Sequence, residues 1–196
     1  MKLKEIFKNA IARTSPSDSL EMRSLVIMQR KPHRFSEDEL RGAAERGWGK
    51  RFDGVEDPMF FVSVDHRVLT VVKAGRHIIR VISIPARYSD DDEYALSQLP
   101  QPEQKKAWTE HRACVLLELL NDLHSKSTPD VEAFASLAKL ALELGDPNCA
   151  AIFLPDRNIM MPNDGTAEQC LRMLVKGELP LKGWQQRIAH FFSGLF

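Results

Sequence analysis

The chain has 196 residues, of which 43% are hydrophobic and 28% are charged, enough apolar material for one core or two small fused lobes. Lysine plus arginine and aspartate plus glutamate both number 27, so the formal net charge is +0 and the composition argues against a general nucleic-acid binder. No segment reaches the roughly 20 apolar residues of a membrane span, and three cysteines without a Cys-x-x-Cys pair are typical of reduced thiols in a cytoplasmic protein.

Residues 1–12 predict a short amphipathic helix, because their apolar side chains recur at helical spacing. This helix can dock on its own domain or on a partner protein, and binding to a membrane surface is a further alternative. Residues 14–19 read Thr-Ser-Pro-Ser-Asp-Ser and predict a linker or turn.

The next stretch, 20–86, predicts a strand, a helix and three further strands. The first strand covers Leu20 to Met28, and Ser36 with Glu39 forms a capping box that begins a helix. Three runs rich in β-branched residues then follow at hairpin distances: Met59–Val64, Val68–Val72 and His77–Ile84. Their alternation of apolar and polar residues is typical of a half-buried antiparallel sheet.

Residues 87–106 interrupt this pattern and predict a surface excursion between two halves of the chain. The four consecutive acidic residues from Asp90 to Glu93 are typical of a solvated loop. Pro102 suits the first position of a short helix that runs through Trp108.

The second half, 107–162, repeats the order of the first. Residues 113–120 predict an apolar strand, and residues 129–145 predict a helix that is apolar over much of its circumference. Two short strands complete the repeat: Cys149–Leu154 and Asn158–Met161.

The C-terminal region predicts two helices. Thr166 with Gln169 forms a capping box for the first. The second, over 180–196, carries large apolar side chains on one side: Trp184, Ile188, Phe191, Phe192 and Phe196. Such a face must be covered by the protein's own sheet, by the N-terminal helix or by a second copy of the chain, so these residues are the candidate interface of a homodimer.

The repeated order predicts a single α+β domain over residues 1–196 with amphipathic helices at both termini. Its sheet would be largely antiparallel and built from two fused β-α-β-β units, 20–86 and 107–162, joined edge to edge with their helices packed on one face. The strand at 113–120 would lie near the middle of the sheet, with His111 at the seam between the units.

Three features of the chain together resemble one protein family. They are an opening strand and acidic-capped helix over Leu25 to Trp48, a sheet segment that ends in Ile84-Pro85, and a Trp108-x-x-His111-x-Ala113 entry into an apolar strand. Over roughly residues 20–164 the chain resembles an uncharacterised bacterial family, domain of unknown function 4261. The resemblance implies a fold and a bacterial origin, and it brings no catalytic residues. Where the family has a Gly-x-Tyr-Trp-like pattern, this chain reads Ala-Ile-Phe-Leu over 151–154.

His111 is the candidate for catalytic chemistry, because a histidine beside carboxylates can act as a general base. Its partner would be one of the acids from Asp90 to Glu93, with Asp91 as the named candidate, or Glu118 in the apolar strand. The alternative is a structural histidine that is hydrogen-bonded at the entry to a core strand, with Glu118 facing solvent or paired. Trp108, His111 and Arg80 are the candidate ligand-binding residues, Arg80 as part of a basic patch near the third strand of the meander.

The sequence lacks the common motifs that identify a catalytic activity. It contains no Gly-x-x-x-x-Gly-Lys, no Gly-x-Gly-x-x-Gly and no Gly-x-Ser-x-Gly. His33, His66 and His77 lack the spacing of a metal site, so we expect neither a metal nor a cofactor.

We therefore predict a cytoplasmic, non-enzymatic interaction or ligand-binding module, with a protein partner or a second copy as its possible partners. The first alternative is a small hydrolase-like enzyme that uses His111 with a nearby carboxylate. The second is a homodimer assembled through the phenylalanine-rich C-terminal helix.

Overall fold

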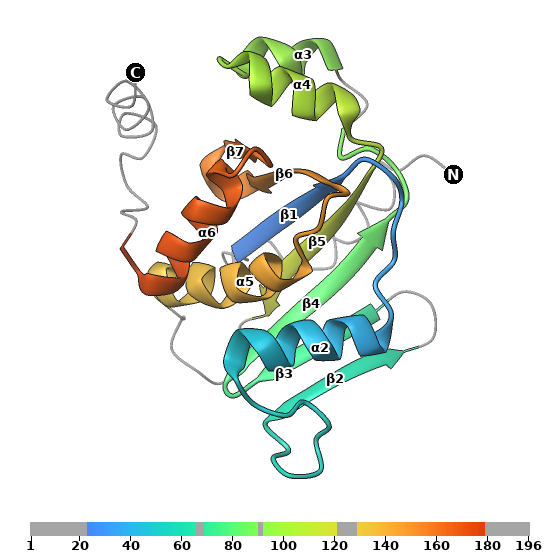
Figure 1. Cartoon of the computed structure of the whole chain (residues 1–196), viewed down its shortest axis with the longest axis vertical. Coiled ribbons are helices and arrows are strands. Elements are labelled where there is room, and N and C mark those ends of the chain that lie inside the picture. The colour runs from blue at the N-terminus through green and yellow to red at the C-terminus, as the bar shows by residue number, and fades with distance from the viewer. Residues whose placement is uncertain (1–22, 66–68, 90–91, 121–128, 179–196) are drawn as a thin grey trace, which may run out of the picture.

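A computed structural model describes residues 23–65, 69–89, 92–120 and 129–178, and a seven-stranded antiparallel sheet runs through this part of the chain (Figure 1). The strands are β1 (Arg23–Gln29), β2 (Phe60–Asp65), β3 (Leu69–Ala74), β4 (His77–Ile84), β5 (Ala113–Leu120), β6 (Cys149–Leu154) and β7 (Ile159–Pro162). Their order is β2-β3-β4-β5-β1-β6-β7, and each neighbouring pair is antiparallel. The predicted α+β class with a largely antiparallel sheet is confirmed.

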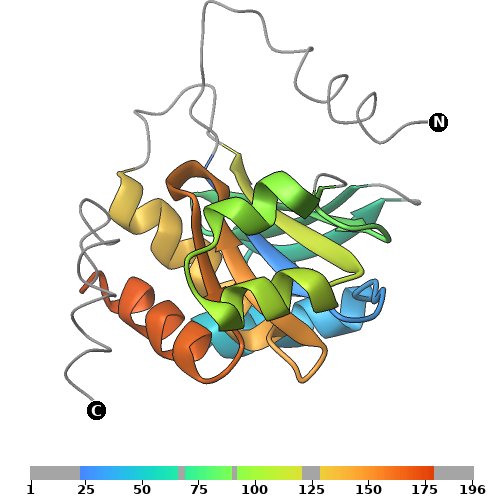
Figure 2. The same cartoon turned by 90° about the horizontal axis from the view of Figure 1, so that it is seen from above.

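The helices of the described residues lie in two groups. They are α2 (Glu37–Trp48), α3 (Asp92–Gln98), α4 (Pro102–Glu110), α5 (Asp130–Leu144) and α6 (Thr166–Lys176), with a 3-10 turn η1 (Pro155–Arg157) between β6 and β7. Helices α2, α5 and α6 pack side by side on one face of the sheet (Figure 1). The α3–α4 pair lies across one end of the sheet, as Figure 2 shows from above.

Alternation along β1 divides the core into two layers. Leu25 and Ile27 belong to the large core beneath α2, α5 and α6. Val26 and Met28 point to the opposite face and pack in a smaller core that contains Trp108 of α4. The predicted helices of the two units, α2 and α5, do share one face, and α4 adds cover on the other.

The two predicted units are interleaved, so the expected edge-to-edge junction is wrong. β5 lies between β4 and β1, and β1 lies between β5 and β6, so the first strand of each unit is inserted beside strands of the other. The physical reason is that β1 and β5 are apolar on both faces and nearly all of their residues are buried. Central positions in the sheet bury both faces of a strand. β5 does lie near the middle of the sheet, as predicted.

Helix ends follow the predicted capping signals to within about one residue. At α2, Ser36 Oγ accepts the Glu39 N–H at 3.2 Å and the Glu39 carboxylate accepts the Ser36 N–H at 2.7 Å, so this capping box is confirmed. At α6 the predicted capping box is wrong, because Gly165 with φ 99° is the N-cap and Thr166 is already helical. There, Asp164 Oδ1 accepts the Thr166 N–H at 3.0 Å.

Part of the acidic run departs from the predicted loop. Asp92 and Glu93 form the first turn of α3, where carboxylates interact favourably with the helix dipole.

The predicted terminal helices, 1–12 and 180–196, lie outside the described residues, as do the candidate interface residues Trp184, Ile188, Phe191, Phe192 and Phe196. Within the described ranges, no helix combines the length and the apolar character needed to cross a membrane.

Candidate functional site

His111 is fully buried at the C-terminal end of α4, with both ring nitrogens bonded to backbone groups. Nδ1 lies 2.5 Å from the carbonyl oxygen of Trp108, and Nε2 lies 3.2 Å from the backbone nitrogen of Tyr88. A carbonyl can only accept and a backbone N–H can only donate, so Nδ1 carries the proton and Nε2 accepts. Burial favours this neutral form and lowers the pKa of His111 below its ordinary value.

A network of polar side chains surrounds this histidine. The Trp108 indole N–H donates to Asp92 at 2.9 Å, and Arg87 donates to Asp92 at 2.6 Å and to the Trp108 carbonyl at 2.9 Å. These bonds, that from Trp108 first, lower the pKa of Asp92. We call Arg87, Tyr88, Asp92, Trp108 and His111 the His111 junction; it ties the end of β4 to α3, α4 and the start of β5.

Glu118 is paired and does not face solvent. Its carboxylate accepts a hydrogen bond from Arg80 Nε at 2.5 Å, directly across the β4–β5 register, and the residue is 7% exposed. Glu118 lies seven positions along an extended chain from His111, a distance of roughly 20 Å. The structure therefore joins Trp108 with His111 and Arg80 with Glu118, but keeps the two pairs apart.

The other two histidines of the described residues each lie beside a glutamate. His33 Nε2 lies 3.0 Å from Glu39 and His77 Nε2 lies 3.0 Å from Glu132. Among the described residues no three potential metal ligands gather at one point. Of the acidic run, Asp90 and Asp91 lie outside the described residues, whereas Asp92 accepts hydrogen bonds from Trp108 and Arg87.

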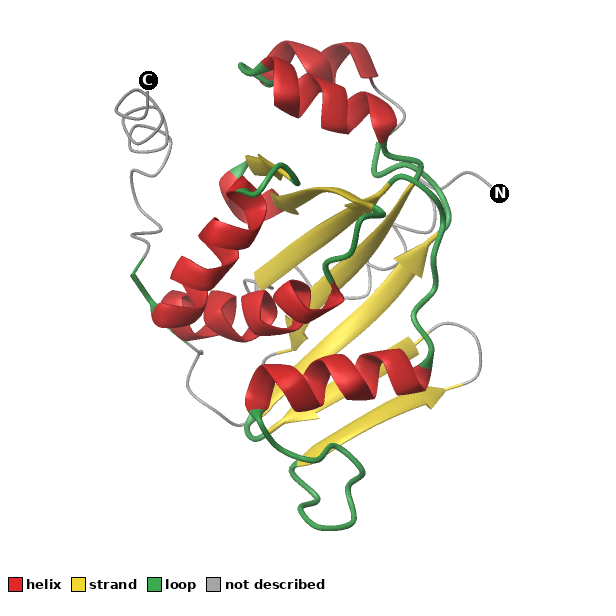
Figure 3. Ribbon diagram, in the orientation of Figure 1, coloured by secondary structure: helices red, strands yellow, loops and turns green. Residues whose placement is uncertain are grey.

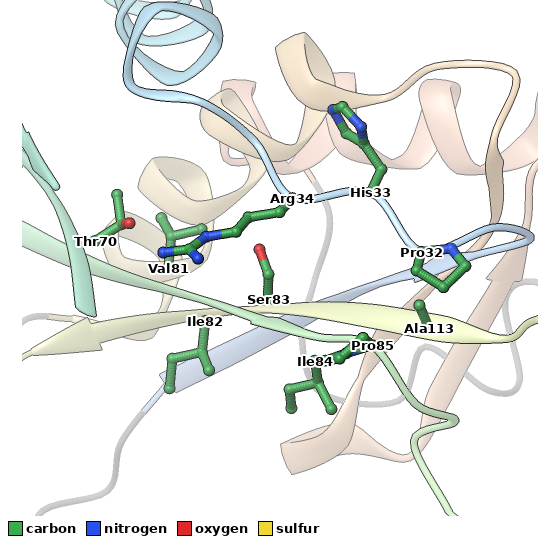
Figure 4. A pocket seen from close by; sticks show the side chains of 10 residues that line it. All are labelled: Pro32, His33, Arg34, Thr70, Val81, Ile82, Ser83, Ile84, Pro85 and Ala113. Atoms are coloured by element: carbon green, nitrogen blue, oxygen red, sulfur yellow. The ribbon is translucent and has the colours of Figure 1, made fainter. Parts of the chain in front are cut away.

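A cavity of about 360 Å³ lies between the β1–α2 loop and the adjoining ends of β3, β4 and β5 (Figure 4). We call it the Arg34 pocket; the argument below uses Arg34 from the loop, Thr70 from β3, Ser83 from β4 and Ala113 from β5. The loop that covers it runs from the end of β1 alongside the sheet to the start of α2 (Figure 3). None of the residues of the His111 junction lines this pocket.

The Arg34 pocket exists because side chains on the helix-covered face become small at the strand ends. Along β4 this face carries Ile79 and Val81 and then Ser83, and along β5 it carries Val115 and then Ala113. The intervening residues of β4 point to the other side of the sheet (Figure 4).

Three polar side chains of the pocket have no partner in the protein. Within the described part of the chain, Arg34, Thr70 and Ser83 make no side-chain hydrogen bond, and Arg34 makes no ion pair. Figure 4 shows the Arg34 side chain extended over Ser83, whereas the His33 ring points away from the strands. No acidic residue occurs among the lining residues. The pocket thus presents one uncompensated positive charge and two free hydroxyl groups.

The sequence gives only a weak signal for the pocket residues Arg34, Thr70 and Ser83, and the comparisons with known proteins do not identify them. The shrinking of side chains at the ends of two strands is visible in the sequence, but it predicts a cavity only once the strands are known to be neighbours. No family model, curated protein or solved structure matches the chain. The resemblance to domain of unknown function 4261 therefore stays a prediction.

Proposed function

We propose that the protein is a non-enzymatic ligand-binding module whose site is the Arg34 pocket. The observation that carries this proposal is the set of three polar side chains, Arg34, Thr70 and Ser83, that face one cavity without hydrogen-bond partners in the described residues. A few convergent polar groups in a concave site are typical of ligand recognition.

The surroundings of the potential catalytic groups favour binding over catalysis. The accepting nitrogen of His111 is already used by the Tyr88 N–H, which leaves no lone pair for a general base. Ser83 would need an adjacent base to act as a nucleophile, and the imidazole of His33 is bonded to Glu39 instead. Cys114, Cys149 and Cys170 are buried, and burial raises the pKa of each thiol to about 12, 12 and 11, respectively.

The proposal is tested by screening a library of small metabolites with ligand-observed NMR, using the full chain and two variants. Ser83→Leu places a larger side chain in the pocket, and binding should be lost. Ser63→Leu is the matched control, because Ser63 is an exposed serine of the edge strand β2 outside the pocket. Circular dichroism establishes that both variants fold.

Two outcomes would overturn the proposed function. One is that no compound binds the wild-type chain. The other is that every compound that binds does so equally well to Ser83→Leu, which would place the binding site elsewhere.

A further inference from the structure

Building on the proposed function, we infer that the Arg34 pocket recognises an oxyanion, a carboxylate or phosphate group of a small molecule. The guanidinium of Arg34 supplies the charge, and the hydroxyl groups of Thr70 and Ser83 supply further donors from the floor of the pocket. Guanidinium groups recognise carboxylates and phosphates because their planar fork of N–H donors matches two oxygen atoms of the ligand.

The charge balance of the pocket supports this ligand class. The other arginines of the described residues either pair with carboxylates, as Arg80 does with Glu118, or bond to backbone carbonyls, as Arg112 does. Arg34 does neither, and no carboxylate lines the pocket to compete with an incoming anion. An anion that enters therefore meets an attractive field, whereas a cation is repelled.

Thr70 provides an independent observation. It is 8% exposed, so more than nine-tenths of the residue is buried, and its hydroxyl has no partner within the described chain. Valine has nearly the same shape and occurs two positions further along the same face of β3, as the fully buried Val72. The hydroxyl oxygen itself stays accessible from the pocket, so an acceptor supplied by a ligand can bond to it.

The dimensions of the pocket limit the ligand to a small molecule. A volume of about 360 Å³ is near the lower end of small-molecule sites, which span roughly 300 to 1,000 Å³. Pro32, Val81 and Pro85 form an apolar part of the lining, suited to a short hydrocarbon portion. The inferred ligand is thus a small carboxylic acid or phosphate monoester, not an extended polymer.

The test uses three probes at constant ionic strength: inorganic phosphate, propionate and the neutral amide propionamide. Two-dimensional ¹H–¹⁵N NMR follows the Arg34 Nε–H and the backbone amides of Thr70 and Ser83. At least one anion should produce saturable shifts at all three positions, and propionamide should bind at least about tenfold more weakly, because it lacks the charge-assisted bonds. Comparison of phosphate with propionate identifies which oxyanion is preferred.

Three variants assign the effect to the inferred groups. Arg34→Gln should weaken anion binding by about tenfold or more, and the isosteric Thr70→Val should weaken it several-fold. Lys31→Gln removes one positive charge from the same loop without touching the pocket, and should change the affinity less than about twofold.

The inference is overturned if neither anion gives saturable shifts, or if Lys31→Gln weakens binding as much as Arg34→Gln. It is also overturned if propionamide binds as tightly as the anions. In each of these cases the proposed function still stands when an uncharged compound from the metabolite screen binds the wild-type chain and loses binding in Ser83→Leu.

Discussion

The His111 junction and the Arg34 pocket contain similar polar side chains, but those of the junction are bonded to one another and those of the pocket are not. In the junction, Arg87 donates to Asp92 and to the Trp108 carbonyl, and His111 is bonded through both ring nitrogens. In the pocket, Arg34 extends over free hydroxyl groups and bonds to none of the described residues. Polar groups bonded to one another stabilise a fold, whereas polar groups left unbonded around a cavity remain available to a ligand. Residue type alone does not separate the two cases.

The largest expected effect on stability is that of Trp108→Ala in the junction. Trp108 is 5% exposed, packs in the smaller core and donates to Asp92, so its removal should lower the free energy of unfolding by about 3–5 kcal/mol. Arg34→Ala should change it by less than about 0.5 kcal/mol, because no bond is lost. Urea denaturation of both variants measures this difference. Equal losses in the free energy of unfolding would show that the junction and the pocket contribute equally to stability.

Glu118→Ala should have the next largest effect, since it leaves the half-buried Arg80 without its partner. We expect a loss of about 1–3 kcal/mol in the free energy of unfolding. Glu168→Ala, which breaks the exposed pair with Arg172, is the matched control and should cost less than about 1 kcal/mol. A cost for Glu118→Ala no greater than that of the control would mean that the cross-strand pair adds nothing to the sheet.

The neutral state of His111 predicts a pH dependence of stability. Burial lowers its pKa below the ordinary 6.5, so the unfolded chain takes up this proton at a higher pH than the folded chain. The stabilisation from neutral His111 is therefore present above pH 6.5 and is lost as the pH falls below it. His111→Asn should flatten the decline in unfolding free energy between about pH 7 and pH 5, whereas Arg34→Ala should keep the wild-type slope.

The contribution of His77 to the pH dependence of stability must be measured separately. Burial also lowers the pKa of His77, so it contributes a decline of the same sign. His77→Gln measures that share. An NMR titration that gave His111 a pKa above 6.5 in the folded protein would contradict the assigned neutral tautomer.

The smallest expected effect on stability is that of Ser83→Cys, a nearly isosteric change in the pocket. The introduced thiol should react with iodoacetamide at about pH 8 at least a hundredfold faster than the three native cysteines, whose buried thiols have raised pKa values. Mass spectrometry of the folded protein measures the four rates. Equally fast labelling of Cys114 would show that the core beneath α4 is no more closed than the pocket.

Much of the secondary structure and one of the two interpretations of His111 could be predicted from the sequence. The residues of β5 and α5, the capping box at Ser36 and the helix that begins at Pro102 all have local signals, and the structure agrees with them. The geometry of His111 agrees with the structural interpretation. Glu118 could be placed on a strand but not assigned a partner, because Arg80 lies 38 residues away.

Local patterns within about fifteen residues determined where strands and helices form, because periodicity and capping depend on near neighbours in the chain. The tertiary structure decided which strands are adjacent. It placed β5 between β4 and β1, where both faces of this mostly apolar strand are covered. The same non-local pairing brought Arg34, Thr70 and Ser83 around one cavity, although the loop and the strands that supply them are far apart in the sequence.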